Sequence, residues 1–126
     1  MEYPILESEA IEKGFYQLSG KEILEKITRK QIRGNYLYGY KYIGVFHPDG
    51  TTEGENNVGA HPFGEYVVNL ESNTLSLFWD SGWDNTTTRA YDVNGEIHFY
   101  DISTGNWRMS FIEFSDIVSD AVTYHD

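Results

Sequence analysis

Apolar and polar residues alternate along the second half of the chain, which is the pattern of strands that bury one face. The alternation is clearest after Gly64, where runs of period two are separated by short turns. Asn94-Gly95 lies between two such runs, and Asn-Gly in this position is the strongest local hairpin signal. The pattern predicts a continuous antiparallel meander with strands over residues 64–70, 74–79, 87–93, 96–101 and 106–114.

The segment before Gly64 is rich in tyrosine and glycine and predicts three further strands. The sequence His47-Pro48-Asp49-Gly50 favours a turn, because proline presets φ and glycine readily adopts a positive φ. A hinge is expected near Gly39-Tyr40. The predicted elements are strands over 31–38, 41–47 and 51–55, followed by a loop over 56–62.

One helix is expected, over residues 19–30. Ser19 and Glu22 have the spacing of a capping box, in which each side chain accepts a hydrogen bond from the other residue's backbone. Ile23, Leu24 and Ile27 follow at helical spacing and predict a buried stripe. We expect this helix to close one end of the sheet, and the loops 47–50, 80–85 and 103–106 to surround the other end.

Eight antiparallel strands leave two unpaired edges, which closure into a barrel removes. The expected fold is therefore mostly β, an eight-stranded antiparallel up-and-down barrel with one short N-terminal helix. At 126 residues the chain corresponds to one domain. We divide it into an arm over 1–17, extended or with a helical turn at 7–13, a barrel domain over 18–114, and a tail over 115–126 that can start with a helical turn at Ser115-Asp116.

The charge balance limits the possible partners. Twenty acidic residues against nine basic ones give a net charge of −11, which disfavours nucleic acid and anionic membranes. The excess acid serves solubility or attracts a basic protein or a cation. The chain has no cysteine, which excludes disulfides, thiolate metal sites and a cysteine nucleophile.

Two features of the sequence bear on localisation. No apolar run is long enough for a transmembrane helix. The first residues do not resemble a signal peptide, so we expect a cytoplasmic protein if Met1 is native. A periplasmic or secreted protein is the alternative if a signal peptide has been removed.

Residues 18–114 resemble the calycins, the family of lipocalin-like and avidin-like small barrels. The resemblance to small bacterial lipocalin-like domains of unassigned function starts at Leu18-Ser19-Gly20-Lys21-Glu22-Ile23, and continues through Ile32-Arg33-Gly34-Asn35, a Pro-Asp-Gly turn and a Gly-x-Tyr-x-Val strand. The run Leu75–Asp80 is similar to avidin-like members. Tyr36 follows Gly34-Asn35 where calycins often have tryptophan, and Arg108 corresponds to their basic residue on the last strand. The resemblance implies a binding barrel or an inhibitor more than an enzyme.

The candidate ligand-binding residues come from the more apolar face of each strand. Arg89 has two equally weighted orientations, inward as an anion-binding group or outward into solvent. For the three tryptophans, core packing is the commoner role. We expect Leu77 to point inward, together with most of the candidate ligand-binding residues, which are Tyr66, Trp79, Arg89, Tyr91, Phe99 and Trp107.

No motif for catalysis, a cofactor or a metal is recognised. The four histidines have no metal-ligand spacing, and Asp80, Asp84 and Asn85 lack the pattern of an EF-hand loop. No nucleophile elbow or triad occurs. The first hypothesis is a non-enzymatic barrel that binds a small apolar or aromatic ligand, with or without a carboxylate. The alternatives are an acidic inhibitor or immunity-type protein that binds a basic enzyme, and a small barrel enzyme of decarboxylase type.

Overall fold

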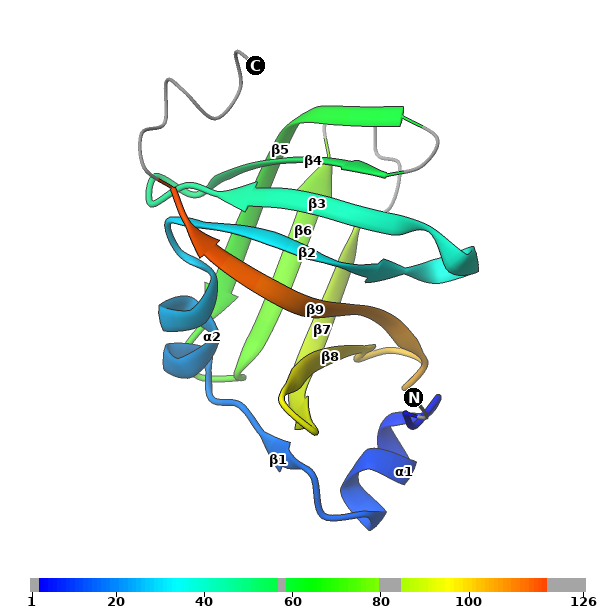
Figure 1. Ribbon diagram of the computed structural model, residues 1–126. Coiled ribbons are helices and arrows are strands. Elements are labelled where there is room, and N and C mark those ends of the chain that lie inside the picture. Colours follow the sequence, from blue (N-terminus) through cyan, green and yellow to red (C-terminus); the bar gives the residue numbers. More distant parts are fainter. Residues whose placement is uncertain (1–2, 57–58, 80–84, 118–126) are drawn as a thin grey trace.

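The computed structural model describes residues 3–56, 59–79 and 85–117. In this part of the chain a β-barrel carries an N-terminal arm along its outside (Figure 1). The elements in chain order are α1 (Glu7–Glu12), β1 (Tyr16–Gln17), α2 (Gly20–Ile27), β2 (Lys30–Tyr36), the 3-10 turn η1 (Leu37–Gly39), β3 (Lys41–Phe46), β4 (Thr51–Asn56), β5 (Gly59–Asn69), β6 (Thr74–Trp79), β7 (Thr86–Val93), β8 (Glu96–Asp101) and β9 (Trp107–Asp116).

Strands β2 to β9 form the closed eight-stranded antiparallel barrel that the alternation predicts. Each strand pairs with the next in sequence, and β2 closes the ring by pairing with β9. Ile32 of β2 shows the closure directly, because it pairs with Gly44 of β3 and with Phe114 of β9. Closure thus pairs the two edges that an open sheet would expose.

The short strand β1 extends the barrel wall at one end. Strand β6 pairs with β7 only as far as Arg89, and β1 then pairs with Tyr91 and Asp92 on the same edge of β7. The Leu18 amide continues this ladder by donating to the carbonyl of Ala90 at 2.9 Å. The arm therefore takes part in the sheet before the chain enters α2.

Helix α2 closes one end of the barrel, as predicted. The capping box is confirmed, since the Glu22 amide donates to Oγ of Ser19 at 3.1 Å and the Ser19 amide donates to Oε1 of Glu22 at 2.8 Å. Ile23 and Ile27 are fully buried, whereas the predicted burial of Leu24 is wrong because this side chain is 38% exposed. The helix ends at Ile27, earlier than the expected residue 30.

Two strands are longer than the sequence predicts. Strand β5 starts at Gly59, within the predicted loop, because these residues pair with β4. Pro62 falls within a register shift of this pairing, where a strand tolerates proline. Strand β9 includes Ser115 and Asp116, which pair with the start of β2, so a helical turn at this position is wrong. In the arm, the helical turn expected near residues 7–13 is confirmed as α1.

The turns follow the expected chemistry, but one lies at the other end of the barrel. Asn94 and Gly95 have φ values of 55° and 92°, as an Asn-Gly hairpin requires. The amide of Arg29, just after α2, donates to the carbonyl of Phe46 at 2.8 Å. The turn over residues 47–50 therefore lies at the α2 end, not opposite it, because successive turns of an up-and-down barrel alternate between its ends.

The barrel interior holds one continuous cluster of buried side chains. Glycines make room for two large rings of the barrel interior. A Cβ on Gly54 would lie 2.9 Å from Cε1 of Tyr42, and a Cβ on Gly64 would lie 2.7 Å from Cε3 of Trp79. Besides Leu18 and residues from α2, the interior cluster includes Ile32, Tyr36, Tyr42, Phe46, Tyr66, Leu75, Leu77, Ala90, Ile97, Phe99, Met109 and Phe111.

Candidate functional site

Three of the six predicted ligand-binding residues lie on the inner face of the barrel. Tyr66 and Phe99 belong to the interior cluster, and Trp79 is buried on the same face of β6 as Leu75 and Leu77. The Tyr66 hydroxyl donates to a backbone carbonyl at 2.5 Å. Their predicted inward orientation is confirmed, and these side chains pack against other parts of the chain.

The other three residues lie on the outer face of β7 and β9. Arg89, for which two orientations were open, points outward and binds Glu7 of α1, with Nε 2.5 Å from Oε2 and Nη2 2.9 Å from Oε1. The Tyr91 hydroxyl donates to the same Oε2 at 2.7 Å. Hydrogen bonding by Arg89 lowers the pKa of Glu7. The carboxylate that Arg89 binds is therefore that of Glu7 and not that of a ligand.

The predicted inward orientation of Tyr91 and Trp107 is wrong. Both belong to a second buried cluster outside the barrel, the outer cluster, where α1 covers them. Trp107 is displaced from the face of Met109 by a bulge, because Met109 pairs with Phe99 but Trp107 pairs with the adjacent Tyr100. The outer cluster consists of Ala10, Tyr91, Val93, Tyr100 and Trp107.

A histidine connects the outer cluster to the arm. His98 is 1% exposed, and its Nδ1 accepts a hydrogen bond from Nε1 of Trp107 at 2.9 Å. Its Nε2 lies 2.9 Å from Oε1 of Glu96, so the neutral ring carries its proton on Nε2. Tyr3 packs on both rings, with centroids 4.8 Å from His98 and 4.9 Å from Trp107.

We expect the free energy of unfolding to fall as the pH decreases below about 6.5, the pKa of an unperturbed histidine. Burial lowers the pKa of His98 in the folded protein, against the opposing effect of Glu96. The unfolded chain therefore binds the proton more readily, and stability is lost as the pH falls through the folded pKa. Urea unfolding at about pH 7.5 and about pH 5.5 measures the change.

The matched control for this prediction is His98→Gln, which keeps a polar side chain that does not titrate. Its stability should change less over the same pH interval than that of the wild type. Protonation of Glu7 also reduces stability, but at lower pH, because the pKa of this carboxyl is lowered from 4.5. Identical pH profiles for the two proteins would contradict a contribution from His98.

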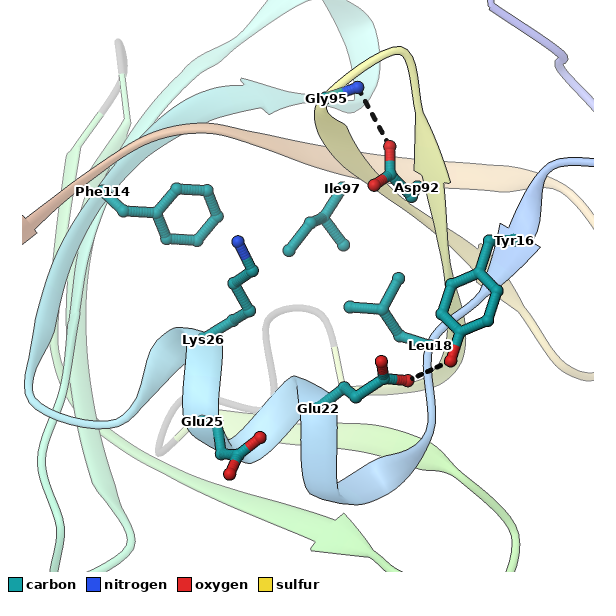
Figure 2. A pocket seen from close by; sticks show the side chains of 9 residues that line it. All are labelled: Tyr16, Leu18, Glu22, Glu25, Lys26, Asp92, Gly95, Ile97 and Phe114. Carbon is teal, nitrogen blue, oxygen red and sulfur yellow. Dashed lines mark hydrogen bonds between the residues drawn. The ribbon is translucent and has the colours of Figure 1, made fainter.

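A pocket of about 360 Å³ lies at the α2 end of the barrel. It is bounded by α2, by the end of the arm, by the β7–β8 hairpin and by the last part of β9 (Figure 2). We call it the α2 pocket. Its apolar surface comes from Leu18, Ile97 and Phe114, of which Leu18 and Ile97 also belong to the interior cluster. The pocket thus lies directly against the core of the barrel.

The polar side of the α2 pocket is partly fixed by hydrogen bonds. The Tyr16 hydroxyl donates to Oε1 of Glu22 at 2.8 Å, and the Gly95 amide donates to Oδ1 of Asp92 at 2.9 Å (Figure 2). The backbone hydrogen bond from Ser19 lowers the pKa of Glu22, which keeps this carboxylate ionised. The capping box thereby also orients a charged group of the pocket.

Lys26 is the cation that lines the α2 pocket. Its side chain extends from α2 into the pocket, toward the space between Phe114 and Ile97 (Figure 2). The ammonium nitrogen lies 5.8 Å from the centroid of the Phe114 ring, which is within the range of a cation–π contact. The geometry suits a small molecule with an apolar body and one polar end.

Comparison with known proteins gives no match. No family model matches the chain, and no similar curated protein or solved structure is found. The barrel is compatible with a calycin-like fold by its architecture.

The described residues lack two features that would suggest other functions. They contain no group of three or more His, Asp or Glu side chains placed to hold a metal ion. No helix among them is long and apolar enough to cross a membrane. Several residues weighed in the sequence analysis lie outside the described part of the chain, namely Asp80, Trp83, Asp84 and His125.

The α2 pocket was not predicted from the sequence. None of the six predicted residues is among the described residues that line it. The spacing of Glu22 and Lys26 places them on one side of α2, which was a usable signal. The spacing alone does not predict a pocket, because its other walls, the Asp92–Gly95 hairpin and Phe114, are brought next to the helix only when the barrel closes.

Proposed function

We propose that this chain is a calycin-like, non-enzymatic barrel that binds a small apolar or aromatic molecule in the α2 pocket. The observation that carries the proposal is a cavity of about 360 Å³ with apolar side chains against the barrel core. Ligand pockets are typically concave and largely apolar, with a few polar groups, and the mouths of β-barrels are common places for them.

The orientation of the other candidates supports this choice of site. Arg89 and Tyr91 bind Glu7, and Trp107 is buried beneath the arm. Tyr66 and Phe99 belong to the interior cluster. A ligand would have to displace parts of the protein to reach these residues, whereas the α2 pocket needs no such displacement. A binding role for the six residues predicted from the sequence stays a prediction.

The proposal is tested by NMR titration of the ¹⁵N-labelled protein with neutral aromatic molecules, namely indole, benzyl alcohol and 2-phenylethanol. We expect saturable shift changes at Leu18, Lys26 and Ile97. Phe114→Ala should weaken binding by about tenfold or less, because an aromatic contact contributes about 0.5–1.5 kcal/mol.

The matched control is Phe78→Ala, which removes a phenylalanine that is 44% exposed and does not line the pocket. This variant should bind as the wild type does. Shift changes that are unsaturable with every compound, or that map to another part of the barrel, would contradict the proposal. Equal weakening by both variants would contradict the α2 pocket as the site.

A further inference from the structure

We infer that the α2 pocket selects a cationic ligand, an apolar or aromatic amine. This inference rests on the proposed function, because it specifies the ligand of the same pocket. Among the described residues, three carboxylates line the cavity, from Glu22 and Glu25 of α2 and from Asp92 of β7, against one ammonium, that of Lys26. A ligand carboxylate would therefore meet more like charges than opposite ones.

The carboxylates have oxygen atoms available for a ligand. The Tyr16 hydroxyl and the Ser19 amide both donate to Oε1 of Glu22. The bond from Gly95 to Asp92 uses Oδ1. Glu22 Oε2 and Asp92 Oδ2 accept no hydrogen bond from the described residues, and Glu25 is exposed. An ammonium group has three donors and can use such acceptors from more than one side.

Lys26 itself shows how an alkylammonium fits the cavity. Its aliphatic chain extends along the pocket, and its charged end lies 5.8 Å from the centroid of Phe114 (Figure 2). The negative face of an aromatic ring attracts a cation, so this contact favours an amine and disfavours an anion. Leu18 and Ile97 provide the adjoining apolar surface. The lysine side chain thus illustrates the contacts that the wall of the pocket offers to an alkylammonium.

The net charge of the whole chain also favours a cationic ligand. The net charge of −11 raises the local concentration of cations around the protein and repels anions. Arg89 was a candidate for binding a ligand carboxylate if it pointed inward, but it points outward and binds Glu7. The expected carboxylate-bearing ligand is therefore replaced in this inference by an amine.

The test compares three ligands that share a phenyl ring and a short linker, which are 2-phenylethylamine, 2-phenylethanol and 3-phenylpropanoate. Affinities are measured by NMR titration at low ionic strength and neutral pH. We expect the amine to bind most tightly and the carboxylate most weakly, with about a tenfold or larger difference between them. About 0.5 M salt should reduce this difference, because it screens exposed charges.

Two variants assign the preference to the pocket. Glu25→Gln should weaken amine binding severalfold and leave 2-phenylethanol unchanged, because Glu25 is exposed and forms no hydrogen bond or ion pair with another described residue. Lys26→Met should strengthen amine binding, since it removes a competing charge and keeps an unbranched apolar side chain. Glu12→Gln is the control, because it changes the net charge equally on an exposed residue of α1 away from the pocket.

The possible results separate the two proposals. Binding of 2-phenylethanol with equal or weaker binding of the amine would overturn the inferred charge preference and leave the binding function standing. A preference for the amine that Glu12→Gln reduces as much as Glu25→Gln would also overturn it, as an effect of net charge. No saturable binding by any of the three compounds would contradict the proposed function, and the inference with it.

Discussion

Replacing Phe111 with alanine is expected to lower the free energy of unfolding by about 3–5 kcal/mol, the usual cost of truncating a buried phenylalanine. Phe111 is fully buried, and its ring lies among those of Phe99, Phe46 and Tyr42, at centroid distances of 4.6, 5.8 and 6.0 Å. These rings come from two other strands of the barrel wall, β8 and β3. Collapse around the cavity would require all of them to move, so the full cost is expected in urea unfolding.

The control for Phe111→Ala is the next residue of the same strand. Ile112 is 38% exposed, and Ile112→Ala should cost less than about 1 kcal/mol. The pair compares one inward and one outward position of the same strand. Similar losses for both variants would contradict the inward orientation of Phe111 and the close packing of the interior cluster.

Ile27→Ala should cost about 2–5 kcal/mol, because it creates a cavity where α2 packs on the barrel. Ile27 is fully buried and belongs to the interior cluster together with Ile23 of the same helix. A helix of eight residues is not stable alone, so α2 depends on its packing against the strands. The lost free energy of unfolding therefore includes part of this packing. Thermal or urea unfolding of the variant measures it.

Leu24→Ala provides the comparison within the same helix. Leu24 is 38% exposed, so its truncation should cost less than about 1 kcal/mol, although its spacing in the sequence suggested the same burial as Ile27. Alanine has a high helix propensity and does not disturb α2. A larger loss for Leu24→Ala than for Ile27→Ala would mean that the helix packs with another face.

The barrel was predictable from the sequence because its signals are local. The alternation along β5 to β9 and the Asn94-Gly95 turn determine the strands and their antiparallel order. The capping box of Ser19 and Glu22 determines where α2 begins. The first residues of β5 and the last residues of β9 were not predictable in this way, because they become strand through pairing with β4 and β2 and not through their own propensity.

The orientation of the site residues was only partly predictable. Alternation shows which residues share a face, but not which face is covered. Tyr91 is buried on the outer face of the barrel because α1 covers it. Glu7 of α1, which binds Tyr91, is 84 positions away in the sequence. Trp107 changes faces at a bulge that leaves no mark in the sequence of β9. The α2 pocket likewise depends on contacts between Phe114, α2 and the β7–β8 hairpin that only the closed barrel creates.

The arm also has a consequence for the order of folding. Glu7 binds Arg89 across 82 positions, and the carbonyl of Pro4 accepts from Tyr100 across 96. During synthesis the arm leaves the ribosome long before its docking surface exists, so these contacts form late. Until then, Tyr91, Tyr100 and Trp107 are exposed on the growing barrel. The same segment should be the first to detach under mild denaturation, and proteases should then cut the chain near Gly14, ahead of global unfolding.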